Sequence, residues 1–404
     1  MARQPQVNKL VLLVQVDALR HDYINEQNSP FIAALGREGF RGVLEPTFGF
    51  EPDGAYLAGL YPDECDGGAH YWRHQEQSPF RSLGRLSPLL NLCPEYLLRR
   101  VLVRGMARLL RQVGYVFPGI ENIPFSVIAN FAPVWRTSPF SPTFRGYRTL
   151  FSICAERGIA YLIHAHPANA VRLESGFSRI SAELRPPTQF AFWHIGDLDT
   201  IGHRNGPLSA ECRRALRNID ARLAALNKQL RAAYEGVNYV VFGDHGMAEV
   251  TGIVDVAGAL RRAGIVQGKG LLYFLDSTMA RFWFQDEGVK DAVIQVLGDL
   301  SGGTLLTQKQ RDDYHLNYPH DRFGELIFLA DPGRLVSPNY FQGRQMVRGM
   351  HGYAPECPEQ QSALVMSGPA RVPAESPLKM TQLFPTVLEI LGLGDQTCAA
   401  PGTG

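Results

Sequence analysis

Continuous apolar runs alternate with stretches of helical periodicity along most of the chain. Runs that are apolar at nearly every position and rich in Val and Leu are typical of strands buried on both faces. Stretches with apolar residues every three to four positions predict the helices between them. This alternation favours an α/β fold with a central, mostly parallel sheet between helix layers. The predicted strands are Lys9–Val16, Gln189–Ile195, Asn238–Phe242 and Gln361–Met366, and the predicted helices are Pro30–Glu38, Ser209–Tyr234 and Met380–Leu391.

The first predicted helix has a typical N-terminal sequence. Ser29 is a residue type that often caps the first free amide groups of a helix, and Pro30 suits the first helical position. We therefore expect Ser29 to be the N-cap residue of this helix.

Two stretches interrupt the alternation of strands and helices. Residues 65–141 are rich in Arg, Leu, Pro and aromatic residues, and we expect them to form an inserted cap. Residues 268–333 contain short aromatic and β-branched runs, which predict a small β-rich excursion. The α/β core would then comprise 1–64, 142–267 and 334–398.

Composition places the chain among ordinary globular proteins. Of the 404 residues, 45% are hydrophobic and 20% charged, and the formal charge is +1, which argues against a bulk nucleic-acid binder. The longest apolar runs are shorter than the roughly 20 residues of a membrane span. We expect no signal peptide and a cytoplasmic protein with reduced thiols, because the cysteines are scattered. They are Cys65, Cys93, Cys154, Cys212, Cys357 and Cys398.

The predicted cap contains an arginine-rich stretch. Its arginines alternate with apolar residues at helical spacing, which predicts a basic amphipathic helix. Such a helix could contact an anionic membrane surface, accept a phosphate-bearing substrate, or simply present a solvated basic face. The arginines are Arg81, Arg85, Arg99, Arg100, Arg104, Arg108 and Arg111.

Acidic residues and histidines gather at the predicted strand ends, where sites form in open α/β sheets. Asp199 and His203 are four positions apart and would share one face of a helical turn. Asp244 and His245 are adjacent, and a bend at Gly246 would bring both to one side. Mixed carboxylate and imidazole donors suit zinc or a similar divalent metal. The candidate ligands are Asp17, Asp199, His203, Asp244, His245 and His351.

Other histidines have less distinctive surroundings. His194 lies inside a predicted strand, and we expect a hydrogen-bonded core histidine there. His70 and His74 flank Tyr71 and Trp72 at the start of the predicted cap. Aromatic residues at that place could stack on a base or a sugar, or only bury the underside of the cap.

The segments with these candidate ligands resemble the alkaline phosphatase superfamily, most closely its nucleotide pyrophosphatase/phosphodiesterase branch. The resemblance implies an alkaline-phosphatase-like fold and a site with two divalent ions, zinc or alternatively manganese. It implies that Asp199, His203 and His351 hold one ion while Asp17, Asp244 and His245 hold the other. The matching segments are Val16–Arg20, Gly59–Pro62, Asp199–Pro207, Gly243–Met247 and His351–Tyr353.

The implied function is metal-dependent hydrolysis of a phosphate ester, most specifically a phosphodiester or pyrophosphate bond. Two cations about 4 Å apart can stabilise the attacking and leaving oxygens of an in-line displacement. The size and aromatic content of the predicted cap suggest a substrate larger than a simple phosphate ester, such as a nucleotide- or lipid-linked sugar. No Cys-x-Pro-x-Arg segment of a sulfatase is present.

The segment that should carry the nucleophile departs from the family pattern. An ungapped match places Gly49 where the family has a Thr or Ser hydroxyl. Thr47 is the nearest hydroxyl and could serve if the loop shifts by two residues. Alternatively, Glu51 or Asp53 could bind a metal and leave a water as the attacking group. Two other functions therefore stay open: phosphomutase-type phosphoryl transfer, and metal binding without turnover.

Overall fold

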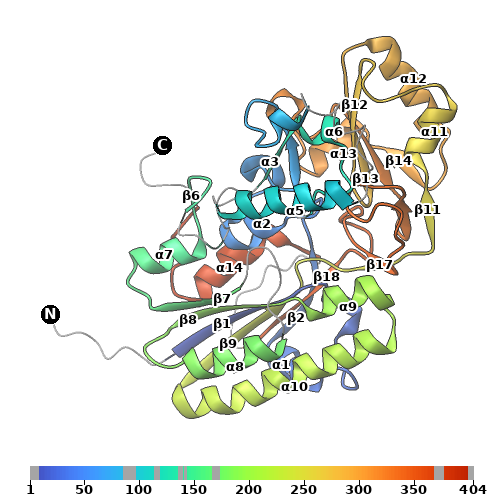
Figure 1. Cartoon of the computed structure of the whole chain (residues 1–404). Helices are drawn as coiled ribbons and strands as arrows, with labels where there is room; N and C mark the ends of the chain where they lie inside the picture. The colour runs from blue at the N-terminus through green and yellow to red at the C-terminus, as the bar shows by residue number, and fades with distance from the viewer. Residues whose placement is uncertain are drawn as a thin grey trace.

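The computed structural model describes residues 9–84, 97–112, 119–134, 140, 143–165, 173–367 and 377–398. A seven-stranded sheet forms its centre (Figure 1). Strand β18 runs antiparallel to both of its neighbours, whereas the other paired strands are parallel, so the prediction of a mostly parallel sheet is confirmed. In spatial order the strands are β19 (Leu378–Lys379), β2 (Phe40–Glu45), β18 (Ser362–Met366), β9 (Gly236–Phe242), β1 (Lys9–Val16), β8 (Phe190–Ile195) and β7 (Tyr161–His164).

Helices cover both faces of this sheet (Figure 1). Strand β1 shows why its sequence is apolar throughout. Leu12 and Val14 belong to the hydrophobic cluster on one face, and Val11 and Leu13 belong to the cluster on the other. The first face packs against α1 (Pro30–Glu38), α8 (Leu173–Glu183), α9 (Asp197–Asn205) and α10 (Ala210–Ala233), and the second against α2 (Asp53–Ala58), α7 (Leu150–Glu156) and α14 (Leu383–Ile390).

The first helix spans the predicted residues and has the predicted N-cap residue, but the capping hydrogen bonds come from elsewhere. Ser29 is the N-cap residue of α1, but its side chain makes no capping hydrogen bond. Its hydroxyl donates to the carbonyl of Asn25 instead. The buried carboxylate of Asp220, on α10, accepts from the amides of Phe31 and Ile32. A residue 190 positions away thus satisfies the free amides, which local sequence could not reveal.

A second sheet of four antiparallel strands lies beside the central one (Figure 1). This sheet packs against elements from residues 65–141. Both parts contribute side chains to one hydrophobic cluster, which includes Phe80, Phe131, Phe274 and Trp283. The strands in order are β12 (Leu271–Leu275), β13 (Met279–Phe284), β15 (Leu326–Ala330) and β14 (Gly303–Leu305). The short elements include β3 (Tyr71–Arg73), α5 (Leu97–Gln112), α6 (Phe125–Ile128) and β4 (Phe131–Pro133).

A buried ion pair fixes this arrangement. The guanidinium of Arg281, on β13, donates to Asp276 at 2.8 Å, and neither side chain is exposed. Arg281 also donates to the carbonyls of Tyr71 and Phe323, at 3.0 and 3.3 Å. The four-stranded sheet therefore holds strand β3 in place through charge-assisted hydrogen bonds as well as apolar contacts. The boundaries proposed for the core, cap and excursion stay a prediction.

Remaining elements connect these layers. Helices α11 (Val256–Arg262), α12 (Glu287–Gly298) and α13 (Gln308–Asp313) accompany the four-stranded sheet, and the short elements are η1 (His21–Tyr23), α3 (Pro62–Cys65), β5 (Thr143–Phe144), β6 (Tyr147–Arg148), β11 (Gly252–Val254), η2 (Pro319–Asp321), β16 (Arg334–Val336) and η3 (Met380–Gln382). Within the described ranges, no helix has both the length and the apolar character that crossing a membrane requires. Five cysteines are free in this part of the chain, whereas Cys93 lies outside it, as does Arg85 of the arginine-rich stretch.

Candidate metal centre

The fold brings the predicted strand ends to one edge of the central sheet. Asp17 follows β1, and Asp244 comes two residues after the adjacent strand β9. Asp199 lies in the first turn of α9, which begins two residues after β8, the neighbour of β1 on its other side. His351 reaches the same edge because β17 (Gly349–Met350) pairs with β10 (Ala248–Glu249), directly after the Asp244 loop. All six candidate ligands therefore converge.

Asp17, Asp244 and His245 form the first group of possible ligands. One side-chain donor atom from each lies within 4.8 Å of the others. The Nε2 atom of His245 is 3.2 Å from Asp17 Oδ1 and 3.8 Å from Asp244 Oδ2. This set agrees with the ion-binding set that the resemblance implies.

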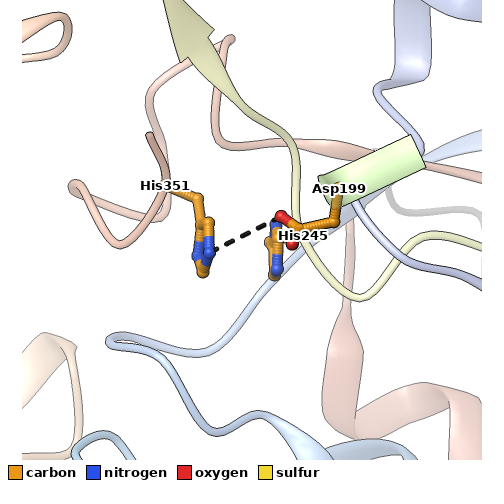
Figure 2. A group of neighbouring side chains, drawn as sticks. All are labelled: Asp199, His245 and His351. Carbon is orange, nitrogen blue, oxygen red and sulfur yellow. Dashed lines mark ion pairs between the residues drawn. The ribbon is translucent and has the colours of Figure 1, made fainter. Parts of the chain in front are cut away.

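Asp199, His245 and His351 form the second group (Figure 2). Asp199 Oδ1 is 3.8 Å from His351 Nε2 and 3.1 Å from the Nε2 of His203, one helical turn away. The rings of His245 and His351 stack at 3.7 Å between centroids. His245 thus belongs to both groups, whereas His203 joins the second through Asp199.

Backbone carbonyls orient two of the imidazoles. Nδ1 of His203 lies 2.8 Å from the carbonyl of Gly349, and Nδ1 of His245 lies 2.7 Å from that of Gly246. A carbonyl can only accept, so Nδ1 carries the hydrogen in each ring. In both rings, Nε2 is then left to face the acidic groups, the arrangement usual for metal-binding histidines.

A hydrogen-bonded network of Gln15, Tyr56 and Asp53 contacts the carboxylate of Asp244. The amide of Gln15 donates to Asp244 Oδ2 at 2.8 Å, and the hydroxyl of Tyr56 lies 2.9 Å from Gln15 Oε1. Tyr56 also contacts the carboxyl group of Asp53, the first residue of α2. Burial, together with the charge of Glu51, raises the pKa of Asp53 to about 7.

The electrostatics of the centre suit cations. Burial raises the pKa of Asp244 to about 6, and the neighbouring Asp17 charge adds to this effect. Burial opposes ionisation of Asp17 too, but contacts with His194 and His245 outweigh it and hold that pKa well below its usual range. Burial opposes protonation of His245, yet the charges of Asp244 and Asp17 raise its pKa to about 10. Burial lowers the pKa of His351, and the nearby His245 charge reinforces this.

Buried ligand atoms without a hydrogen-bond partner indicate whether these residues suit a metal ion. Oδ1 of Asp17 and Oδ1 of Asp199 are buried, and among the described residues neither accepts a hydrogen bond of good geometry, although the Nε2 atoms of His245 and His203 lie 3.2 and 3.1 Å away. Nδ1 of His351 is also buried, and it makes no hydrogen bond within the described part of the chain. Unpaired buried carboxylate oxygens are costly unless a cation or donor satisfies them. These residues therefore fit divalent ions, and the mixed oxygen and nitrogen donors are compatible with zinc.

Metal binding should release a proton. Because the pKa of His245 is about 10, this imidazole is protonated near pH 7.5, whereas a metal ligand must be neutral. We expect close to one proton to leave per protein as zinc binds, and more below about pH 6, where Asp244 is also protonated. Calorimetric titrations in buffers with different ionisation heats measure this number. His164→Asn, at a buried histidine outside both groups, should release the same number, and a heat independent of buffer would contradict the prediction.

Gly49 occupies a position where no side chain fits. Its φ angle is +99°, and a Cβ atom would lie 1.9 Å from the carbonyl oxygen of Gly68. The amide of Phe50 donates to that same oxygen at 3.2 Å. The glycine thus permits two backbone segments to approach closely, and a Thr or Ser hydroxyl could not replace it without moving the loop.

The alternative residues of this loop have different surroundings. Thr47 is half-buried and, within the described part of the chain, makes no hydrogen bond to the six candidate ligands. Its role as nucleophile stays a prediction. Glu51 contacts the ring of His70, and Asp53 contacts Tyr56. Neither carboxylate belongs to the two groups of possible ligands.

His194 is a site residue that the sequence did not identify. Its Nε2 atom is 3.3 Å from Asp17 Oδ2, and the contact with Asp17 raises the pKa of His194 against the effect of burial. The expectation of a hydrogen-bonded core histidine named no partner, and the structure shows that the partner is a candidate metal ligand. His194 lies on β8 opposite Gln15 of β1, and this register could have indicated that it approaches the strand end.

Comparison with known proteins identifies the class. Residues 134–354 match the family described as type I phosphodiesterase / nucleotide pyrophosphatase, and this stretch exceeds half of the 404 residues. The chain therefore belongs to this family. The predicted relationship to the nucleotide pyrophosphatase/phosphodiesterase branch is confirmed.

Individual relatives are distant in sequence. The bis(5'-adenosyl)-triphosphatase ENPP4 of Pongo abelii is 23% identical over 246 residues, which cover 56% of this chain and 50% of the relative. The chain thus spans about half the length of this curated relative.

Solved structures share the fold. Human ENPP5 superposes with a TM-score of 0.64 at 18% identity, covering 98% of this chain and 97% of that protein. An inactive variant of murine ENPP5 in complex with AMP superposes with the same TM-score at 19% identity and with the same coverage. At these identities the likeness shows the fold alone, and it confirms the alkaline-phosphatase-like α/β prediction.

Proposed function

We propose that the chain is a metal-dependent hydrolase that cleaves a phosphodiester or pyrophosphate bond at a two-metal centre. The observation that carries the proposal is the convergence at one sheet edge of five carboxylates and imidazoles in two overlapping groups, with His203 beside Asp199. Family membership supports the same class of reaction.

Two divalent ions, with zinc as the first candidate and manganese as the second, fit these ligands. Asp17, Asp244 and His245 would hold one ion; Asp199, His203 and His351 would hold the other. When bound, the ions would polarise the phosphoryl oxygens and lower the pKa of a coordinated hydroxyl or water. No family hydroxyl occupies position 49, so the identity of the attacking group stays open between the Thr47 hydroxyl and a water.

The residues of the chain have separable roles in this proposal. Gln15 fixes the orientation of Asp244 through its amide, and the carbonyls of Gly246 and Gly349 fix the imidazoles. Phe50, whose ring lies against His351, helps to exclude water from that side of the centre. The chain's own groups therefore supply carboxylate oxygens and imidazole Nε2 atoms for the ions, once His245 has lost its proton.

The substrate we propose is a small phosphate ester with an organic group on each side of the phosphorus. An AMP complex of a structural relative and the name of ENPP4 point to nucleotide esters in those proteins. A nucleotide- or lipid-linked sugar is our finer proposal for this chain. The exclusion of nucleic acid as a partner and the cytoplasmic location stay predictions from the sequence. Contact of the arginine-rich stretch with an anionic membrane surface stays an alternative to a solvated basic face.

A metal-reconstituted assay tests the function. Zinc-loaded protein should hydrolyse bis(p-nitrophenyl) phosphate and a nucleoside p-nitrophenyl diester faster than p-nitrophenyl phosphate, and chelation should abolish both reactions. Faster monoester cleavage would overturn the diester specificity. Two bound ions without turnover of any phosphate ester would favour the alternative of a metal-binding homologue.

A further inference from the structure

Beside the metal centre, Glu51 and His70 form a carboxylate–imidazole pair that the ligand set does not use. Nδ1 of His70 contacts Oε1 of Glu51, and the two side chains keep 24% and 13% of their surface exposed. The carboxylate holds the Nδ1 hydrogen, so Nε2 is left as the free atom of the ring. A partly exposed imidazole oriented in this way can transfer a proton to a bound molecule.

Phe50 connects this pair to the metal centre. The His70 ring stacks on Phe50 at 5.6 Å, and Phe50 meets the edge of His351 at 5.7 Å. The backbone at Gly352 packs closely on the same ring, since a Cβ there would lie 2.4 Å from it. His70 is therefore held one aromatic ring away from His351, on the side of the group formed by Asp199, His245 and His351.

The close contact between Gly49 and Gly68 explains how the pair is assembled. It fixes the loop that carries Phe50 and Glu51 against the segment that leads to His70. Arg281 holds the next residue of that segment through the carbonyl of Tyr71. Gly49, which has no hydroxyl, thus permits the loop geometry that brings the Glu51 carboxylate beside the His70 imidazole.

We propose that His70, oriented by Glu51, is the general acid that protonates the leaving group. In an in-line displacement the leaving oxygen lies opposite the attacking one. Attack from the side of Asp17 and Asp244 directs the leaving oxygen toward His351 and His70. The phosphorus–oxygen bond to the leaving group breaks as His70 Nε2 gives its proton to that oxygen. The attacking hydroxyl, of a water or of Thr47, forms the new phosphorus–oxygen bond and loses its proton to solvent, from which His70 is reprotonated. Where Thr47 attacks, water then hydrolyses the Thr47 phosphoester and restores the hydroxyl.

The charges around His70 are compatible with this role. Glu51 is in contact, and Asp276 lies near enough for its pKa to respond to His70, although Arg281 already pairs with Asp276. His351 is the neighbouring imidazole, and its own pKa is lowered.

Leaving-group dependence tests the proposal, which rests on the proposed diesterase function. The probes are two diesters of one nucleoside monophosphate, with p-nitrophenol or ethanol as leaving group. A p-nitrophenolate departs without a proton, whereas an ethoxide requires one. In His70→Asn, kcat/KM should fall about 10²- to 10⁴-fold for the ethyl ester and less than about tenfold for the p-nitrophenyl ester. Glu51→Gln should shift the same ratio by a smaller factor.

His74 provides a matched control. It belongs to the same segment but lines a cavity of 890 Å³ between β3, α6 and β12, away from the candidate ligands. His74→Asn should leave both rates unchanged, and all variants should bind zinc like the native protein. Equal losses on both esters in His70→Asn, or a native protein that cleaves only the p-nitrophenyl ester, would overturn the assignment of His70. Failure of the native protein to cleave either ester would overturn the diesterase function itself.

Discussion

Replacing Asp244 by Asn should remove most of the activity and one of the two bound ions. Asp244 provides a buried carboxylate to the group with Asp17 and His245, and the Gln15 amide already occupies part of its hydrogen-bonding capacity. Loss of groups that only orient metal ligands typically costs 10- to 100-fold, so removing a ligand charge should lower kcat/KM for a diester at least about 100-fold. Elemental analysis should find about one zinc per chain instead of about two.

A second buried aspartate separates this effect from simple destabilisation. Asp220, on α10, accepts two backbone hydrogen bonds at the start of α1 and belongs to neither group of possible ligands. Asp220→Asn keeps an oxygen acceptor and should retain both ions and the native rate. Full zinc occupancy in Asp244→Asn would show that this carboxylate does not bind the metal.

Introducing Thr at Gly49 should destabilise the protein and should not restore a nucleophile. A Cβ at this residue would overlap the Gly68 carbonyl, and φ of +99° is unfavourable for any side chain. Overpacking and a left-handed backbone together predict a loss of about 2 to 5 kcal/mol in the free energy of unfolding. Diester hydrolysis should fall as well, because displacement of the loop moves Phe50 and Glu51. Denaturant titration and the diester assay measure the two effects.

Gly146 offers a control for backbone strain alone. Its φ is +87°, but nothing lies within 4 Å of a Cβ built there. Gly146→Ala should therefore cost only about 1 to 2 kcal/mol. The difference between the two variants isolates the overlap with Gly68. An increase in activity in Gly49→Thr would instead show that the loop can rearrange to present a hydroxyl.

The convergence of the candidate metal ligands could be anticipated because each of them stands next to a strong local signal. Lys9–Val16 is apolar throughout and ends at Asp17, and parallel strands deliver their carboxyl ends to one edge. The spacing of Asp199 and His203 needs only a helical turn. The strand end at Asp17 and the helical turn of Asp199 and His203 depend only on residues that are neighbours in sequence. Local sequence was therefore sufficient to predict their positions.

The surroundings of the ligands depend on contacts between distant segments and were not predictable in the same way. His194 reaches Asp17 only because β8 pairs with β1, and Glu51 reaches His70 only because Gly49 lies against Gly68. The cap of α1 by Asp220 has the same origin. In each case the neighbouring sequence contains no pattern that identifies the contact, because tertiary packing determines which residue becomes the partner.

Residues 65–141 and the four-stranded sheet share one hydrophobic cluster. If the predicted cap contacts the substrate, substitutions that change substrate preference there must also preserve the packing of this cluster. Phe131 and Trp283, for example, meet edge to face at 5.2 Å across this boundary. A chimera that imports only one of the two stretches from a relative would leave such surfaces mismatched. Changes in selectivity should therefore arise through correlated substitutions on both sides, and grafting experiments should transplant the two stretches together.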